Sequence, residues 1–536
     1  MMPAALPPMV LHEDEHLLVV NKPPGWNTHA PAEYAGEGVY DWLRGHERRW
    51  AQLAIIHRLD KDTSGVLVFA KSDLANRSLT EQFTQRKVAK EYVLITDRSP
   101  RPTPFIAKSE ILRQGDRYAS VPPGRGGQPA ETHFIPGVRT DKGLLVVAKP
   151  VTGRTHQIRV HAAQHGFPVL GDTLYGGAPS HRLHLHARRI ELTHPETSLR
   201  VWYEAPPDFV RPPRLLRRSA IVAPQDTDAY RIAHGEADAL PDWQIDRWGD
   251  HVVLSGERPL TPELLADAEA EAGLAECQPS CIWHRRLLKR PRGAATTSAS
   301  PALIRGSAPS GPTHVIENGA RFEIRFTEGY SLGLFLDQRD NRRRILTGYV
   351  DKEIAPWPCG TGQPQALNLF AYTCAFSVCA ALAGARTTSV DLSKKYLDWG
   401  KANFVANGLD PAAHEFLHGD VFGWLKRMGR RGRSFDLLIM DPPTFSTSKE
   451  SGEWHAERDF PKLLETALPL LKPGGTLFAS CNAAKWDEAA FVESVHEAIV
   501  SAKRNVEHAR YVPQPPDFPI TPEHPGHLKA IWAVVD

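Results

Sequence analysis

One short segment carries residue types suited to catalysis: residues 57–65 read His-Arg-Leu-Asp-Lys-Asp-Thr-Ser-Gly. Its carboxylate, Asp60, lies between the basic Arg58 and a Thr-Ser-Gly turn, and the apolar run Val66–Ala70 follows at once. A strand directly after a glycine-containing turn gives the loop a rigid base, which a positioned catalytic group requires. An acid in a turn is most often only a solvated surface group, but this setting favours a carboxylate that acts on a substrate as nucleophile or as general base.

The same segment matches the His-Arg-Leu-Asp-x-x-Thr-Ser-Gly signature of the RluA-type pseudouridine synthases at every fixed position. The resemblance covers residues 1–210 and includes Lys90-Glu91-Tyr92 and the Gly-Arg-Thr-His-Gln-Ile-Arg run within Thr152–His161. It implies that the chain converts uridine in RNA to pseudouridine, by cleaving the C1′–N1 bond and rejoining the uracil through carbon 5. Because this isomerisation involves no redox change and no group donor, this half is expected to need no cofactor.

The resemblance also assigns roles to individual residues of this half. Asp60 would act at the ribose, as nucleophile or as base, and Tyr92 would stack on the uracil and help to remove its carbon-5 proton. Arg159 would pair with Asp60, which keeps a carboxylate ionised in a dry pocket. A stacked uridine must leave its helix to reach Asp60, so base flipping is expected. The residues expected to hold phosphate or the extruded nucleotide are Arg58, Arg154 and His156.

A second candidate site lies in residues 366–392, which read as a strand, a tight turn, a helix and a second strand that ends at Asp391. An acid about twenty residues after the turn can accept both ribose hydroxyls of a bound nucleoside. The turn has no Gly-x-Gly-x-x-Gly phosphate loop, which favours S-adenosylmethionine over NAD. Cys374 stands where related turns usually carry glycine, so its side chain is expected to crowd the turn. The residues expected to bind this cofactor are Asn368, Phe370, Tyr372, Asp391, Asp420, Asp441, Pro442 and Arg339.

Residues 229–536 resemble the 23S rRNA methyltransferases that modify carbon 5 of cytosine or N7 of guanine. The segments that carry this resemblance are Tyr230–Asp238, Gln244–Asp250, Gly333–Arg339 and Asp441–Lys449. It implies methyl transfer from S-adenosylmethionine to an rRNA base, with Phe445 stacking on the target.

The identity of the methylated atom depends on one cysteine. Carbon 5 of cytosine needs a cysteine nucleophile, and Cys481 stands where the cytosine enzymes carry theirs, whereas a ring nitrogen needs only alignment. The segments Asp441–Lys449 and Val390–Trp399 look more like the guanine branch. We therefore favour guanine N7 slightly, with Cys481 as a buried small residue, and keep it as the possible nucleophile of the alternative.

The composition is that of an ordinary globular protein. The chain has 536 residues, a formal net charge of +2 and six cysteines. A nucleic-acid surface must therefore be local, and the cysteine count is typical of a reducing compartment. The N-terminus lacks a signal-peptide pattern, and no apolar run is long enough for a membrane span, so a cytoplasmic location without a membrane partner is expected. RNA is the expected partner, 23S rRNA before tRNA, with no DNA and no metal.

Two different patterns of elements must position the two sites. Residues 1–210 contain many short strands and few helices, which predicts an α+β domain with a mixed, largely antiparallel sheet. Residues 314–536 alternate strands with helices, which predicts an α/β, Rossmann-like parallel sheet. A basic linker (211–228), a small α+β domain (229–292) and a flexible Gly/Ser-rich segment (293–313) are expected between them. The predicted strands are Leu17–Asn21, Val66–Ala70, Lys90–Thr96, Gly143–Lys149 and Ser198–Glu204 in the first half, and Ala366–Phe370, Thr387–Asp391, Phe435–Asp441 and Gly475–Ser480 in the second.

The sequence thus indicates a bifunctional RNA-modifying enzyme. The alternative is an active pseudouridine synthase whose methyltransferase-like half only binds RNA, which Cys374 leaves open. The basic clusters Arg211–Arg218 and Arg285–Arg292 are interpreted either as phosphate-contacting surfaces or as solvated linker.

Overall fold

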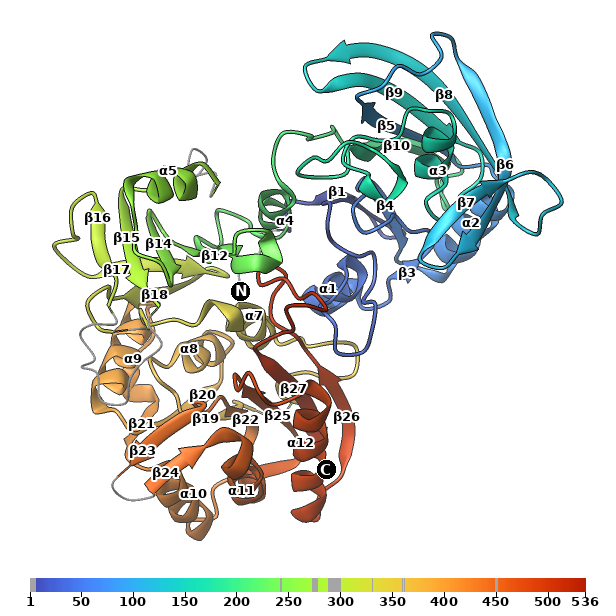
Figure 1. Ribbon diagram of the computed structural model, residues 1–536. Coiled ribbons are helices and arrows are strands. Elements are labelled where there is room, and N and C mark those ends of the chain that lie inside the picture. The colour runs from blue at the N-terminus through green and yellow to red at the C-terminus, as the bar shows by residue number, and fades with distance from the viewer. Residues whose placement is uncertain are drawn as a thin grey trace.

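The computed structural model describes residues 6–241, 243–271, 278–287, 300–329, 331–358, 360, 362–448 and 452–536. Figure 1 shows a β-rich N-terminal part (blue to teal) at one end and a layered α/β part (orange to red) at the other, with a small green sheet beside them. Within the described residues, none of the helices combines the length and the apolar character that crossing a membrane requires. Some of the residues named above lie outside this description: residues 288–292 of the second basic cluster, residues 293–299 and Lys449.

The N-terminal part is built on one mixed sheet, as predicted. Its strand order is β1-β2-β4-β10-β5-β9-β8-β6-β7, with β3 beside β4 and β11 beside β10. The pairings are antiparallel except that of β4 with β10, which is parallel. The five predicted strands recur at nearly the predicted bounds. The strands are β1 (Val10–Glu13), β2 (Leu17–Lys22), β3 (Ala54–Ile55), β4 (Ser64–Ala70), β5 (Ala89–Thr96), β6 (Phe105–Gln114), β7 (Arg117–Val121), β8 (Gln128–Thr140), β9 (Gly143–Pro150), β10 (Leu185–Thr193) and β11 (Arg200–Glu204).

Three helices accompany this sheet and form close to the segments with helical pattern: α1 (Val39–His46), α2 (Asp73–Thr84) and α3 (Gln157–Gln164). The pattern did not predict β1, β3, β10 or the ribbon β6–β7–β8. The ribbon is the longest of the missed parts. Its buried positions include small or polar residues such as Ala107, Ser109 and Thr132, so the apolar alternation that marks a strand is weak there.

Gly65, the glycine of the Thr-Ser-Gly turn, sets the position of the loop that carries Asp60. It begins the parallel contact between β4 and β10, where it lies opposite Ala187. Its φ is +118°, and a Cβ at this position would lie 2.2 Å from the carbonyl oxygen of Ala187. Only glycine tolerates this approach, so the turn is tied rigidly to the centre of the sheet.

The C-terminal part is a Rossmann-like sheet with the strand order β21-β20-β19-β22-β25-β27-β26. The first five strands are parallel, and β27 runs antiparallel to β25. The order reverses direction between β19 and β22, and ligands bind at such a switch point, beyond the carboxyl ends of the strands. The four predicted strands are confirmed. The bounds are β19 (Gln365–Leu369), β20 (Arg386–Asp391), β21 (Glu415–His418), β22 (Phe435–Met440), β25 (Leu471–Cys481), β26 (Val506–Tyr511) and β27 (Lys529–Val535).

Both faces of this sheet are covered by helices. Leu437 and Ile439 of β22 belong to one hydrophobic core, with α8, whereas Leu438 and Met440 belong to a second core, with α11. A strand buried on both faces reads as a continuous apolar run, and the run Leu437–Met440 made β22 recognisable in the sequence. The elements around the sheet are α7 (Arg339–Thr347), α8 (Ala375–Leu382), α9 (Lys394–Ala406), α10 (Val421–Arg430), α11 (Ala456–Ala467), α12 (Glu488–Ser501), and the hairpin of β23 (Phe445–Ser448) and β24 (Gly452–His455).

The chain between these two parts forms a small sheet, and the segment predicted as a basic linker is folded. The sheet has the strand order β12-β13-β14-β15-β16, and a two-stranded hairpin, β17–β18, follows it. In place of a linker the chain forms helix α4 (Pro213–Ile221), whose Arg218 is 3% exposed and bound to both carboxylate oxygens of Asp238. Arg214 and Arg217 are also buried, at 9% exposed each, so the expectation of a solvated or phosphate-binding cluster is wrong for these three arginines of Arg211–Arg218. The further elements are β12 (Ala229–His234), β13 (Gln244–Trp248), β14 (His251–Gly256), α5 (Pro262–Glu271), β15 (Cys281–Arg286), β16 (Ala302–Arg305), β17 (Thr313–Glu317) and β18 (Ala320–Ile324).

Candidate active sites

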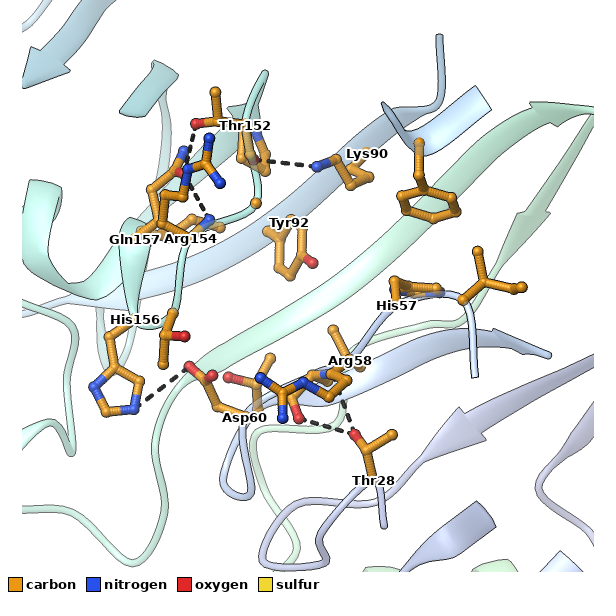
Figure 2. Close-up of a pocket in the computed structure, with 18 of the residues that line it drawn as sticks. Thr28, His57, Arg58, Asp60, Lys90, Tyr92, Thr152, Arg154, His156 and Gln157 are labelled. Atoms are coloured by element: carbon orange, nitrogen blue, oxygen red, sulfur yellow. Dashed lines mark hydrogen bonds and ion pairs between the residues drawn. The ribbon is translucent and has the colours of Figure 1, made fainter. Parts of the chain in front are cut away.

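The carboxylate of Asp60 lies at one wall of a cleft of about 860 Å³. The loop that carries it is closed by a hydrogen bond from the Thr63 N–H to the Asp60 carbonyl, at 3.1 Å. Oδ2 of Asp60 lies 3.9 Å from Nη1 of Arg159 and 4.0 Å from Nε2 of His156, and both of these residues lie at the start of α3. Figure 2 shows Asp60 and His156 on one side of the Tyr92 ring, with Arg154 across the cleft. The predicted residues of the first site are thus brought together from three separate segments, at residues 58–60, 92 and 154–159.

Arg159 has a closer partner than the predicted one. Its Nε and Nη2 each donate to a carboxylate oxygen of Asp172 at 2.7 Å, so its contact with Asp60 is a looser second one. Burial by itself would lower the pKa of Arg159, but the hydrogen bonds and charge of Asp172, followed by the charge of Asp60, outweigh burial and raise it. A fixed cation therefore faces Asp60 at any physiological pH. Nothing in the spacing of the sequence indicated that Asp172 binds Arg159.

Tyr92 lies on β5 and lines the cleft, as predicted. Burial, and then the charge of Asp60, raise the pKa of its phenol far above its usual value. The hydroxyl therefore stays protonated at neutral pH, and the ring presents a flat apolar surface to anything that enters the cleft. Arg58 and Arg154, predicted to hold the nucleotide, also line this cleft.

Two threonines of this site escaped the sequence reasoning. The Thr28 hydroxyl donates to the carbonyl of Leu59 at 2.9 Å and accepts from the N–H of Leu59 at 3.2 Å. It thereby clamps the backbone one residue before Asp60. Within the described part of the chain, the buried Thr63 hydroxyl has no hydrogen-bond partner although it lines the cleft. Such an orphaned group is expected to bind substrate or water.

The second site is a cavity of about 560 Å³ at the carboxyl ends of β19, β20 and β22. Asp391 accepts hydrogen bonds from the N–H groups of Tyr372 and Ser393, both at 2.8 Å. Burial raises the pKa of this carboxyl group. The predicted cofactor residues that line the cavity are Phe370, Tyr372, Asp391, Asp420, Asp441 and Pro442.

The turn after β19 reaches a tight conformation without glycine. Phe370, Tyr372 and Cys374 all have positive φ values, of 58°, 49° and 60°. The Cys374 side chain is fully buried and does not line the cavity. It points instead at Gly400 of α9, where an added Cβ would lie 2.5 Å from its Sγ. The expected crowding of the turn by Cys374 does not arise, because the missing side chain at Gly400 makes room for the thiol.

This contact predicts that a substitution at Cys374 restores stability that is lost through a substitution at Gly400. We expect Gly400→Ala to lower the free energy of unfolding by about 1–3 kcal/mol, since the new methyl group overlaps the thiol. With Cys374→Gly in the same chain, the nearest atom would be the carbonyl carbon of Thr373 at 3.4 Å, so most of that loss should be recovered. Chemical denaturation of both single variants and the double variant measures the coupling. Simple additivity of the two changes would contradict this account.

Some predicted residues lie outside the second cavity. Arg339 is buried and donates to both carboxylate oxygens of Asp517 at 2.8 Å, so its assignment to the cofactor is wrong, because this carboxylate draws it away. Asn368 is 2% exposed and bonds Ser377 behind the turn. Two further predicted residues also do not line the cavity: Phe445, which is 53% exposed on the β23–β24 hairpin, and Cys481, which is fully buried at the end of β25.

The residues in their place come from neighbouring positions. Gln338 lines the cavity and donates to Asp441 at 3.2 Å, and the Ser480 hydroxyl donates to the same carboxylate at 2.7 Å. Burial raises the pKa of Asp441 to about 6. Trp454 of β24 also lines the cavity, and its indole N–H donates to the Pro443 carbonyl at 2.7 Å. The cavity is therefore lined by both aromatic and polar side chains, an arrangement suited to a nucleoside with a charged tail.

Comparisons with known proteins divide the chain in the same way. Residues 16–164 match the family model described as RNA pseudouridylate synthase, and residues 286–532 match that of S-adenosylmethionine-dependent methyltransferases. The ribosomal RNA large subunit methyltransferase I of Aliivibrio fischeri (strain MJ11) is 32% identical over 302 residues, 55% of this chain and 71% of the relative. The ribosomal large subunit pseudouridine synthase C of Yersinia pestis is 39% identical over 220 residues, 38% of this chain and 67% of the relative. A solved structure, SMU.776 with bound SAH, is 28% identical, covers 57% of this chain and 76% of its own, and has a TM-score of 0.49.

Proposed function

Because the chain belongs to the RNA pseudouridylate synthases through its first half and to the S-adenosylmethionine-dependent rRNA methyltransferases through its second, we propose that one polypeptide performs two modifications of large-subunit rRNA. The observation that carries this proposal is the presence of two separate cavities, each with its own carboxylate: Asp60 in the first and Asp391 in the second. Below, the first part is called the synthase half and the second the methyltransferase half.

In the synthase half, a flipped uridine enters the cleft and stacks on Tyr92. Asp60 acts at the ribose, either by bonding to C1′ or by removing a proton, while the C1′–N1 bond breaks. The uracil then turns and rejoins C1′ through carbon 5, and the carbon-5 proton leaves. Arg159, fixed by Asp172, presents its positive charge to the Asp60 carboxylate for this step. Arg58, Arg154 and His156 are proposed to hold the nucleotide.

In the methyltransferase half, the residues of the second cavity fit S-adenosylmethionine, which supplies the methyl group when bound. Asp391 retains oxygen lone pairs beyond its two backbone contacts, and these can accept the ribose hydroxyls. Phe370 and Trp454, with ring centroids 5.7 Å apart, offer flat surfaces to an adenine. Asp441 and Pro442 lie at the proposed target-base end, where the protein only needs to align the acceptor atom.

We propose guanine N7 as the methylated atom in preference to carbon 5 of cytosine. A covalent mechanism needs a thiolate that touches the base. Cys481 is 0% exposed, and burial raises the pKa of its thiol. Its sulfur accepts a hydrogen bond from the Ala483 N–H at 3.4 Å. These features support a structural role for this cysteine and favour alignment at a ring nitrogen.

Cys481→Ala is therefore expected to keep methyl transfer near the wild-type rate. A catalytic nucleophile would lose about 10⁴-fold or more in the same substitution. Single-turnover transfer from labelled S-adenosylmethionine to rRNA, followed by mass spectrometry of the nucleosides, measures the rate and identifies the base. Ser480→Ala is the neighbouring comparison, because it removes a hydroxyl that binds Asp441. A 5-methylcytosine product that disappears in Cys481→Ala would overturn the choice of guanine.

The whole proposal is tested by mapping modified nucleosides in rRNA and tRNA from cells with and without the gene. We expect one pseudouridine and one methylated base to be lost together. The alternative function, a synthase whose second half only binds RNA, predicts loss of the pseudouridine alone. Calorimetric titration with S-adenosylhomocysteine separates the two cases in vitro, because that alternative predicts no binding.

A further inference from the structure

The two halves meet along a polar, buried interface. In the synthase half, α1 faces α7 of the methyltransferase half, and the Trp42 indole donates to Asp340 at 2.9 Å. The Arg343 guanidinium donates to the His46 carbonyl at 2.8 Å, and the Tyr349 hydroxyl donates to the Arg44 carbonyl at 2.8 Å. Contacts with this many buried partners fix the relative position of two elements more firmly than a flexible tether would.

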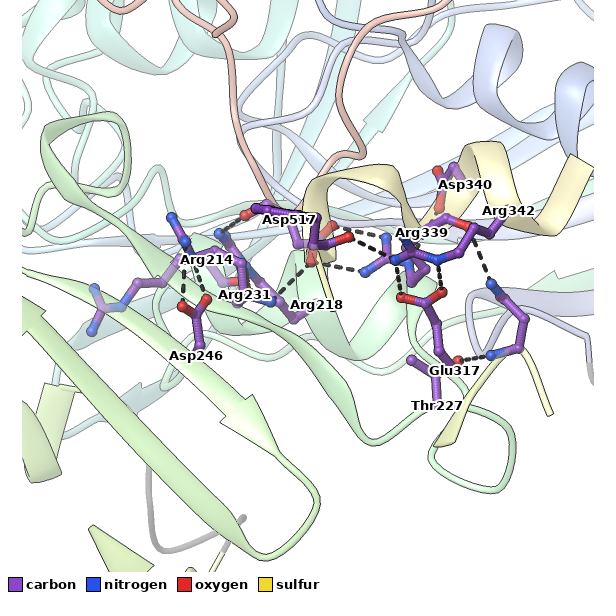
Figure 3. A network of polar contacts seen from close by, with 12 residues as sticks. Arg214, Arg218, Thr227, Arg231, Asp246, Glu317, Arg339, Asp340, Arg342 and Asp517 are labelled. Atoms are coloured by element: carbon purple, nitrogen blue, oxygen red, sulfur yellow. Dashed lines mark hydrogen bonds and ion pairs between the residues drawn. The ribbon is translucent and has the colours of Figure 1, made fainter. Parts of the chain in front are cut away.

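The methyltransferase side of this interface is itself held rigidly. Figure 3 shows Asp517, in the segment between β26 and β27, between arginines of three different elements. Arg339 of α7 donates to its carboxylate, Arg231 of β12 donates its backbone N–H, and Arg218 of α4 donates to its carbonyl. A carboxylate with 0% of its side chain exposed and this many donors has one conformation.

Besides Arg343, the arginines Arg344 and Arg510 reach the synthase half, and both approach the Glu37 carboxylate, Arg344 at 3.9 Å. Arg510 of β26 donates to the Glu37 carboxylate at 2.8 Å and to the Asp41 carbonyl at 3.4 Å. The Glu37 carbonyl in turn accepts from the Trp26 indole at 2.7 Å, and a carboxylate oxygen of Asp41 accepts from the N–H groups of Ala30 and Gly38. The loop 26–38 is therefore tied at both ends to the two residues that Arg510 holds.

That loop forms part of the synthase cleft. Asn27, Thr28 and His29 line the cleft beside Asp60. Thr28 also binds both backbone groups of Leu59, the residue before the catalytic carboxylate. A continuous series of hydrogen bonds thus runs from Arg510 in the methyltransferase half, through Glu37 and the loop, to the backbone that carries Asp60.

We propose that Arg510 is a positioning residue for pseudouridine formation, supplied by the methyltransferase half. It fixes loop 26–38 and, through Thr28, sets the place of Asp60 opposite the ribose. This inference rests on the proposed function of the synthase half and adds a contribution from the other half. Misplacing a catalytic group by about 1 Å can cost about 100-fold in rate, so small movements of the loop suffice.

The test uses the full chain with Arg510→Ala, Arg510→Lys and Glu37→Gln. We expect kcat for pseudouridine formation to fall about tenfold to 100-fold in Arg510→Ala, with KM for RNA and the affinity for S-adenosylhomocysteine unchanged. Arg510→Lys keeps one charged contact and should recover part of the rate, and Glu37→Gln should show a smaller loss. The rate of amide hydrogen exchange at residues 26–38 should increase as kcat falls across these variants. Arg458→Ala, an exposed arginine on α11 that pairs with its neighbour Asp459, is the matched control.

Each result has a definite meaning. An unchanged kcat in Arg510→Ala and Glu37→Gln would overturn the proposal, as would a parallel fall of kcat, cofactor affinity and thermal stability, which marks a general loss of structure. If Arg510→Ala does not fold, the proposal stands or falls on Arg510→Lys and Glu37→Gln. Wild-type protein and Asp60→Ala are measured in the same assay. An inactive wild type would contradict the proposed function itself, whereas an active wild type with a normal Arg510→Ala contradicts only this inference.

Discussion

Asp60→Ala abolishes pseudouridine formation, with an expected loss of about 10⁴-fold or more, because the side chain that acts at the ribose is gone. Asp60→Asn should be nearly as severe, since an amide keeps the shape but neither bonds covalently to C1′ nor takes a proton. The measurement is the rate of pseudouridine formation in large-subunit rRNA by the purified full chain. Because Asp60 is part-exposed and bound to the fold through its backbone, stability should change little.

The loop provides its own control. Asp62 stands two residues later and is exposed, so Asp62→Ala removes an equal charge from the same turn. It should retain most of the activity, and Asp60→Ala should still bind RNA and methylate it at the normal rate. Equal losses in Asp60→Ala and Asp62→Ala would show that the loop only needs negative charge. The assignment of Asp60 as the acting carboxylate would then be withdrawn.

Asp391→Ala should remove binding of S-adenosylmethionine and, with it, methyl transfer. Hydrogen bonds to a charged group contribute about 1.5–3 kcal/mol each, so losing two ribose contacts weakens affinity about 100-fold or more. The N–H groups of Tyr372 and Ser393 would also lose their acceptor, and the left-handed turn between β19 and α8 would lose its support. Calorimetry with S-adenosylhomocysteine measures the affinity, and labelled methyl transfer measures the activity.

Asp398→Ala on α9 is the matched control, because that carboxylate is exposed and pairs only locally with Lys401. Pseudouridine formation should persist in Asp391→Ala, since this residue lies outside the contacts that reach the synthase cleft. Undiminished affinity for S-adenosylhomocysteine in Asp391→Ala would refute the ribose assignment. Loss of both modifications would instead show that the two halves act only when the cofactor is bound.

The secondary-structure elements and the reactive side chains could be recognised from the local sequence pattern. The apolar run Val66–Ala70 of β4 follows directly after the turn that carries Asp60, and Asp391 is the last residue of β20. Residues whose role depends on their own chemistry and on a neighbouring strand can be found in one dimension, because a short segment holds both. The division into an α+β half and an α/β half followed from the same periodicities.

The partners of those groups depended on the tertiary structure. Three contacts join segments that lie between 13 and 473 residues apart in the chain. Asp172 binds Arg159, Gly400 leaves room for Cys374, and Arg510 binds Glu37. The arginines of α4 look like a nucleic-acid surface in sequence, since charge pattern alone cannot tell an exposed cation from one paired with a buried carboxylate. The sequence by itself determined which side chains act, whereas packing between distant segments decided what holds each of them, because ion pairs and close contacts depend on distance in space and not along the chain.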